Sequence, residues 1–278
     1  MTDILLTNDD GIDAPGLWAA AAALAPIGRV TVVAPMTNQS GMSAAVRLHG
    51  PVALRRGDGA DYGLPGVRWY AADVPPASCV SIGLRLYCPK PDLVVSGINP
   101  GCNMGRDVIA SGTVGAACAA ALAGYPAIAV SMDVGEPVEW EAVGGAITAT
   151  ARAALRHSDA VRGTVLNLNV PNLPAAEVRD VLVTRLSDWE YGQMLDMRES
   201  DGGIEFVWDS AWRKLTGEPG TDAWAVGEGY VSLTLLRPTL ALPLAAPIEA
   251  AMRAEVRDAL LGTDTPPPSD AVPTGVPS

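Results

Sequence analysis

The sequence predicts an α/β fold with a doubly wound, mostly parallel sheet of the Rossmann-like kind. Short apolar runs of strand length alternate with longer segments of helix length, which is the order typical of such a sheet. The apolar runs carry no polar alternation, as expected of parallel strands that are buried on both faces. At 278 residues the chain is long enough to bury a sizeable core.

The first strand, helix and strand are predicted within the first 34 residues. Residues 3–7 form an apolar run that predicts a buried strand. Pro15 opens an Ala-rich helix that Pro26 and Gly28 end, since proline suits a first helical turn and breaks a helix interior. Residues 29–34 then predict the second strand.

The central part of the chain continues the same alternation. Gly-, Pro- and Asn-containing segments separate its elements. The expected order is a polar loop at 35–43, short antiparallel pieces in 45–72, a strand at 92–96, a glycine-rich segment at 97–111, a helix of small residues at 112–122, a strand at 127–131, a helix at 139–157 and a strand at 165–170.

The C-terminal third changes character at residues 185–222, which show no clear helical period. Trp189, Trp208 and Trp212 lie there among charged and glycine residues. We interpret this segment as a projecting β-hairpin arm, because exposed aromatic arms often pack on a partner subunit.

A strand at 230–236 and a helix at 247–261 follow the arm. Pro247 and Gly262 provide the proline-first, glycine-last pattern of a helix. We therefore expect one domain over residues 1–262, and a disordered tail rich in Pro, Thr and Ser at 263–278.

The charge of the chain disfavours binding to nucleic acid polymers. Nineteen Lys and Arg against 31 Asp and Glu give a net charge of −12, whereas such binding depends on neutralising phosphates with basic side chains. No apolar run reaches the roughly 20 residues of a membrane span. Because the first predicted strand begins at residue 3, we expect no signal peptide. We expect a cytoplasmic protein that binds no membrane.

Cysteine and histidine chemistry is disfavoured as well. The four cysteines form no CxxC pair, and His49 and His157 are far apart in sequence, so a Cys/His zinc site is not expected. Two histidines also leave little room for a Ser-His-Asp or Cys-His mechanism. Reduced thiols are the default expectation.

The most informative segment is the end of the first strand, where Asp9 and Asp10 stop the apolar run. Such a pair is either a solvated turn or a cation site. Ser40 and Asn99 also follow predicted strands, and the loops after parallel strands share one edge of the sheet. Carboxylate, hydroxyl and amide oxygens suit Mg²⁺, Mn²⁺ or Ca²⁺, although ordinary turn chemistry is the alternative for Ser40 and Asn99.

A second candidate lies at the start of the helix at 112–122. Ser111 reads as an ordinary N-cap, but the free N–H groups of Gly112 and Thr113 and the helix dipole also make an anion site. A cation beside a helix N-terminus is the arrangement that a phosphate ester needs. Neither a P-loop motif nor GxGxxG after the first strand is present.

These residues lie in motifs that resemble the SurE family of metal-dependent nucleotidases. ILLTNDDGIDAPGL (4–17) is similar to the family's N-terminal signature, and Gln39-Ser40-Gly41 to its Ser-Gly loop. VVSGINPGCNMGRDVIASGTVGAA (94–117), LNLNVPN (166–172) and TDAWAVGEGYVSLT (221–234) match further blocks in order. The resemblance covers about residues 3–236.

The resemblance implies a Rossmann-like core, one divalent metal ion per subunit, and hydrolysis of nucleoside monophosphates as a 5'/3'-nucleotidase. The metal would be Mg²⁺ or Mn²⁺, with Ca²⁺ an alternative in a crystal. The mechanism we expect is in-line attack of a metal-activated water, with Asp9 and Asp10 catalytic. The implied sites are metal ligands Asp9, Asp10, Ser40 and Asn99, phosphate contacts Asn103, Ser111, Gly112 and Thr113, and supporting residues Asn8 and Asp107. The arm would join homodimers or homotetramers.

The chain departs from the family pattern in three places. The family's Gly-Thr-Pro-Ala-Asp-Cys block is Val74-Pro75-Pro76-Ala77-Ser78-Cys79 here. Ala110 replaces a tyrosine that usually precedes Ser-Gly-Thr. Ala119 and Ala120 stand where the family usually has an acidic residue. Two alternatives therefore stay open. One is a SurE-like phosphatase specialised for a non-nucleotide or biosynthetic monoester, and the other is a non-catalytic nucleotide-binding module. A nucleotide-sugar transferase ranks last, because the chain is too short for a second Rossmann half.

Overall fold

The computed structural model describes residues 1–189, 195–200, 202–208, 215–239 and 246–261. The chain divides into two compact units, Met1–Pro238 and Thr239–Ser278. The second unit contains helix α7 (Ala246–Leu261), at the place predicted for a C-terminal helix. The predicted tail at 263–278 lies outside the described residues, and one domain over 1–262 stays a prediction.

The first unit contains one large sheet of nine strands. These are β1 (Asp3–Thr7), β2 (Arg29–Pro35), β3 (Leu54–Asp58), β4 (Arg68–Ala72), β5 (Leu93–Pro100), β6 (Ala127–Met132), β7 (Val165–Val170), β8 (Val181–Thr184) and β11 (Val231–Leu236). Their order is β3-β4-β2-β1-β5-β6-β7-β11-β8. Among the described residues of this sheet, only the β3–β4 and β7–β11 pairs are antiparallel, so the predicted mostly parallel sheet is confirmed.

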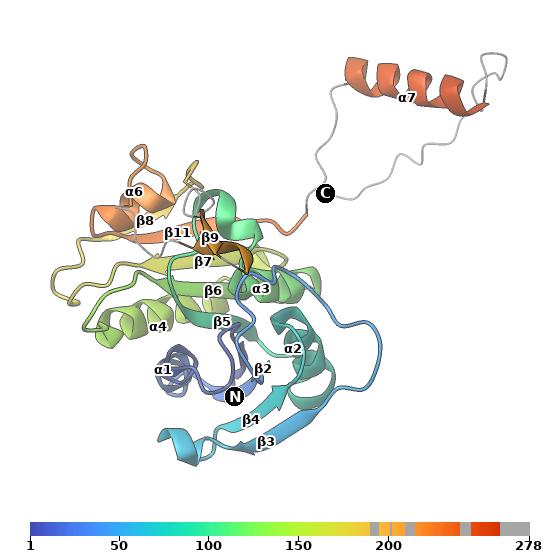
Figure 1. Ribbon diagram of the computed structural model, residues 1–278. Coiled ribbons are helices and arrows are strands. Elements are labelled where there is room, and N and C mark those ends of the chain that lie inside the picture. Colours follow the sequence, from blue (N-terminus) through green and yellow to red (C-terminus); the bar gives the residue numbers. More distant parts are fainter. Residues whose placement is uncertain (190–194, 201, 209–214, 240–245, 262–278) are drawn as a thin grey trace. The chain divides into compact units, whose positions relative to one another are not determined.

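Helices cover both faces of this sheet (Figure 1). The α-helices of the first unit are α1 (Pro15–Leu24), α2 (Pro76–Ile82), α3 (Gly112–Leu122), α4 (Trp140–Arg156), α5 (Ser158–Val161) and α6 (Asp222–Gly227). Helices α1 and α4 pack on one face, and α2 and α3 on the other. The sequence reading missed α2, α6 and β8, because elements of four to seven residues are too short to show a period.

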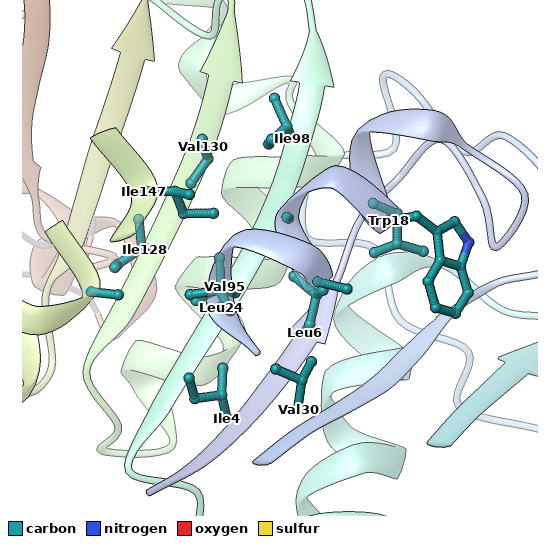
Figure 2. Close-up of a cluster of buried hydrophobic side chains, with 14 of the residues drawn as sticks. Ile4, Leu6, Trp18, Leu24, Val30, Val95, Ile98, Ile128, Val130 and Ile147 are labelled. Atoms are coloured by element: carbon teal, nitrogen blue, oxygen red, sulfur yellow. The ribbon is translucent and has the colours of Figure 1, made fainter. Parts of the chain in front are cut away.

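The core consists of two layers, one on each side of the sheet. Ile4 and Leu6 of β1 point to the layer under α1 and α4, while Leu5 between them points to the layer under α2 and α3. Figure 2 shows the first layer, in which Leu24 of α1 and Ile147 of α4 lie against the strands. Because both faces are buried, the strands need no polar alternation, and this explains their apolar sequences.

Strand β1 lies between β2 and β5, and this order positions the candidate site. Leu6 pairs with Val32 of β2, and Thr7 pairs with Ser96 of β5, all in parallel register. The chain leaves β1 toward β2 on one side, while β5 lies on the other side. Ligands of open α/β sheets bind at such a switch point, outside the carboxyl ends of the strands.

The segment at 185–222 contains an antiparallel pair, β9 (Leu195–Ser200) and β10 (Gly203–Trp208), in a sheet of its own. The predicted hairpin is therefore present, while residues 190–194, 201 and 209–214, including Trp212, lie outside the described residues. Half-buried Trp189 packs against a cluster of its own chain that contains Cys102 and Met104. The predicted role of the arm in oligomerisation stays a prediction.

No helix in the described ranges is long and apolar enough to cross a membrane.

The buried carboxylate of Asp222, the first residue of α6, ties distant segments together. Its two oxygens accept the backbone N–H groups of Gly105 at 2.9 Å, Ser187 at 2.9 Å and Ala223 at 2.8 Å. Gly105 begins the 3₁₀ turn η3 (Gly105–Ile109), so the carboxylate fixes the segment that leads into α3. Hydrogen bonds to an ionised acceptor are the stronger kind.

We expect Asp222→Ala to lower the free energy of unfolding by about 3 kcal/mol, because it leaves buried N–H groups without an acceptor. The measurement is urea denaturation followed by circular dichroism. Asp159→Ala, at an exposed position in α5, is the matched control and should change stability by about 0.5 kcal/mol or less. Equal midpoints for the two variants would contradict this role of Asp222.

Candidate active site

Asp9 lies directly beyond β1, with its carboxylate buried against the N-terminus of α3. Its side chain is only 3 % exposed. The Thr113 hydroxyl donates to Asp9 Oδ1 at 2.5 Å, and the nearby backbone N–H groups of Gly112 and Thr113 lower the pKa of this carboxylate. The structure therefore joins the two sites that the sequence pointed to separately, the acidic pair and the helix start.

Gly112 permits this close approach because it has no side chain. A Cβ atom at this position would lie 2.8 Å from both Cβ and Oδ2 of Asp9, closer than real Cβ contacts. Any other residue would push the carboxylate away from the helix. The sequence motif marked Gly112 as part of a helix start, and the structure gives the physical reason for a glycine there.

The loop after β2 lies against both aspartates. The backbone N–H of Gln39 donates to the Asp9 carbonyl at 2.6 Å. Asn38 Nδ2 donates to Asp10 Oδ1 at 3.3 Å, and Asn38 Oδ1 accepts the N–H of Ser40 at 2.9 Å. Asn38 thus links Asp10 to the exposed Ser40. Sequence reasoning missed Asn38, because nothing local distinguishes it from the other polar residues of this loop.

The same loop is held farther along by residues at two of the three departures from the family pattern. Ser43 donates its N–H to the carbonyl of Ala110 at 3.0 Å. Arg47 donates its N–H to Ser78 Oγ at 2.9 Å. The departures at Ser78 and Ala110 therefore contact the loop that carries Ser40.

Asn99 and Asn8 reach the same edge of the sheet from β5 and β1. Asn99 is half-buried, and its Nδ2 donates to the Gly101 carbonyl at 2.6 Å. The fully buried Asn8 donates to the Gly11 carbonyl at 2.9 Å and so holds the turn after β1. Gly11 has φ +104°, a conformation that favours glycine. The hydrogen bonds described for Asn99 do not join it to Asp9 or Asp10.

Asn103 lies in a buried polar layer formed with the ends of β6 and β7. Its backbone N–H donates to Asn169 Oδ1 at 2.8 Å, and its carbonyl accepts from Asn167 and Asn169. Its side-chain Nδ2 donates to Ser131 Oγ at 2.7 Å. An amide nitrogen carries two hydrogens, so this bond leaves one N–H for a ligand.

The remaining predicted residues lie at or near the start of α3. Ser111 is the N-cap, and its Oγ accepts the N–H of Val114 at 3.1 Å. Thr113 is fully buried and uses its hydroxyl hydrogen on Asp9 rather than on a ligand. Asp107 lies in η3, where its carbonyl accepts the N–H of Ala110 at 2.9 Å.

Asp9 and Asp10 are neighbouring buried carboxylates that repel each other when both are charged. Burial raises the pKa of Asp9, although hydrogen bonds from Thr113 and Gly112 offset part of that effect. Burial, and next the charge of Asp9, raise the pKa of Asp10 to about 7. Asp10 Oδ2 is buried without a hydrogen-bond partner among the described residues. A cation at this position would relieve both the repulsion and the unpaired oxygen.

The donor set fits a hard divalent cation. Asp9 and Asp10 offer carboxylates, and Ser40 and Asn99 offer neutral oxygens at the same edge. Within the described ranges, no three His, Cys, Asp or Glu side chains gather into a metal cluster. Two carboxylates with neutral oxygens and water suit Mg²⁺, which keeps part of its hydration shell.

The raised pKa of Asp10 predicts that the stability of the protein in chelator depends on pH. Its carboxyl has a folded pKa of about 7 against an ordinary 3.8, so it favours the folded state below about pH 4 and loses this contribution as the pH rises toward 7. At about pH 8 in chelator, Asp10→Asn should therefore be more stable than the unsubstituted protein by about 2 kcal/mol. The difference should vanish near pH 4. Urea denaturation at both pH values checks this.

Added Mg²⁺ provides the control for this prediction. Saturating Mg²⁺ should raise the denaturation midpoint of the unsubstituted protein at about pH 8 and have little effect on Asp10→Asn. If the unsubstituted protein in chelator at about pH 8 were as stable as Asp10→Asn, or more stable, the destabilising effect of the Asp10 carboxylate would be refuted.

Comparisons with known proteins agree on one family. The family model described as survival protein SurE matches residues 4–193. A Yersinia pestis protein named 5'/3'-nucleotidase SurE is 38 % identical over 242 residues, covering 86 % of this chain and 91 % of that protein. A Dehalococcoides mccartyi protein named 5'-nucleotidase SurE is 37 % identical over 242 residues, covering 85 % and 89 %.

A solved structure extends this likeness to three dimensions. The crystal structure of the SurE protein from Aquifex aeolicus is similar with a TM-score of 0.74 and 32 % sequence identity. The likeness covers 92 % of this chain and all of that one. The resemblance predicted from the motifs is confirmed, and the chain belongs to the SurE family.

Proposed function

We propose that this SurE-family protein is a divalent-metal-dependent phosphomonoesterase that hydrolyses nucleoside monophosphates. The observation that carries the proposal is the Asp9 and Asp10 pair packed at the N-terminus of α3. The pair suits a cation, and the helix end suits an anion. The names of the relatives, 5'- and 5'/3'-nucleotidases, support this substrate class.

In this proposal the chain holds the reactants at two adjacent poles. Asp9, Asp10, Ser40 and Asn99 would hold the cation, which when bound polarises phosphoryl oxygens and lowers the pKa of water. Thr113 is a positioning residue, because its hydroxyl fixes Asp9. Asp10 would orient the attacking water and accept its proton while the water oxygen bonds to phosphorus in line with the ester oxygen. The P–O bond to the alcohol would then break, and the leaving alkoxide would take a proton from solvent.

The second pole would hold the phosphoryl group. The start of α3 at Ser111, Gly112 and Thr113 supplies the positive end of a helix dipole, and Asn103 supplies a side-chain N–H. Both stabilise the negative charge that develops on the phosphoryl oxygens during transfer.

A phosphatase specialised for a non-nucleotide monoester is the second candidate. The observation in its favour is that the side-chain hydroxyl of Ser78, at a departure from the family pattern, accepts an N–H of the loop that carries Ser40. A change in this loop would alter the groups that surround the substrate without removing a metal ligand. A screen of phosphate release over nucleoside monophosphates, sugar phosphates and polyphosphate separates the two candidates.

Self-association through the β9–β10 hairpin is part of the proposal. Met197 and Ile204 on these strands are 59 % and 60 % exposed. Exposed apolar side chains of this size are typical of surfaces that pack on a partner.

The central test is Asp9→Asn, assayed for phosphate release from a nucleoside monophosphate at saturating Mg²⁺ or Mn²⁺. We expect kcat to fall at least about 100-fold, because one of two charged ligands is lost. Asp159→Asn, at an exposed position, should keep full activity. Undiminished turnover of Asp9→Asn would overturn the mechanism.

Gly112→Ala tests the contact between Asp9 and the helix without changing any polar group. The added Cβ displaces the carboxylate, so we expect kcat/KM to fall about 100-fold, as small misplacements in active sites do. Gly145→Ala is the matched control, since a Cβ there meets no atom within 4 Å and alanine favours the helix. Equal activity of the two variants would refute the constraint.

A further inference from the structure

A cavity of about 950 Å³ lies beside Asp10. It is lined by the starts of α1 and α4, the loops that follow β6 and β7, and residues at the end of α6. Ile98 and Pro100, the two chain neighbours of Asn99, also line it. The cavity therefore reaches the edge of the sheet where we place the cation, with Asp10 in its wall.

The lining of this cavity is apolar with an acidic component. Apolar side chains make up most of its wall, among them Met132, Val134 and Val138. Trp140, the first residue of α4, lines it and is 39 % exposed. The apolar area and the indole ring favour an uncharged group that carries a ring, through burial and stacking.

Charge in the cavity has one sign. Asp10, Asp133 and Glu136 are among the lining residues, and the described part of the wall includes no Lys or Arg. A second anionic group in this space would meet the carboxylates of Asp133 and Glu136, which no Lys or Arg of the described wall compensates, and this costs free energy through repulsion and desolvation. An uncharged group escapes both penalties.

We propose that this cavity holds the alcohol part of the phosphate ester, and that it selects uncharged, ring-bearing alcohols over alcohols that carry a second phosphate. Trp140 stacks on the ring, while Asp133 and Glu136 reject the extra charge. The volume is near the upper end of the roughly 300 to 1,000 Å³ of small-molecule sites, so a nucleoside fits with room to spare. This inference rests on the proposed function and adds the selection of the substrate to it.

The first experiment compares three substrates at saturating Mg²⁺: adenosine 5'-monophosphate, glycerol phosphate and adenosine 3',5'-bisphosphate. Trp140→Ala should lower kcat/KM for the monophosphate about tenfold, mainly through KM, because stacking contributes to binding. Because glycerol phosphate has no ring, its kcat/KM should change less than about twofold in this variant. Leu86→Ala is the control, because it removes an exposed apolar side chain of η2 (Gly83–Tyr87) that does not line the cavity. It should leave kcat/KM unchanged for both substrates. Equal losses on all substrates, or no loss, would overturn the stacking role.

The second experiment tests the acidic residues. Asp133→Asn combined with Glu136→Gln should raise the ratio of kcat/KM for the bisphosphate to kcat/KM for the monophosphate about fivefold or more, because a neutral wall no longer repels the second phosphate. Asp159→Asn removes one charge at an exposed position outside the cavity wall and should leave this ratio unchanged. An unaltered ratio between the two substrates would overturn the acidic selection.

A binding measurement separates failure of the inference from failure of the proposed function. Adenosine, which carries no phosphate, should change the tryptophan fluorescence of the protein, and the change should be lost in Trp140→Ala. Absence of phosphate release from any monoester, together with this adenosine signal, would refute the hydrolase and support the cavity. Phosphate release without any Trp140-dependent signal or selectivity would refute the cavity alone.

Discussion

The contact between the Asp9 carboxylate and the N-terminus of α3 is the constraint on which the candidate site depends. A buried carboxylate is costly without partners, and here Thr113 and the first N–H groups of the helix supply them. These donors offset part of the rise in the pKa of Asp9 that burial causes, at a place where Asp10 adds a second carboxylate. The helix therefore fixes the acidic pair and lends its positive end to the same small space.

The order of the strands explains why this contact forms at all. Because β1 lies between β2 and β5, the loop after β2 and the end of β5 come to either side of the acidic pair. Helix α3 follows β5 and packs on the opposite face of the sheet from α1. Its small residues let it lie close to the strands, so that Gly112 reaches Asp9.

Buried polar anchors hold the loops around this edge. Asn167 and Asn169 of β7 form hydrogen bonds with the backbone of Asn103. The Asp222 carboxylate accepts the N–H of Gly105, 117 residues away in sequence. The segment from Asn103 into α3 is thereby fixed at two points to strands and helices of the far half of the sheet. Such preorganised donors stabilise charge without rearranging during a reaction.

The sequence by itself determined the sheet, the main helices and the acidic pair, because apolar periods and helix-start residues act over a few neighbours. It also marked Ser40, Asn99 and Gly112 through motifs, without showing what each one touches. Only the tertiary structure decided that Asn38 bridges Asp10 and Ser40, that Thr113 spends its hydroxyl on Asp9, and that an acidic, apolar cavity opens beside Asp10. These features depend on packing between segments far apart in the chain, which local patterns do not record.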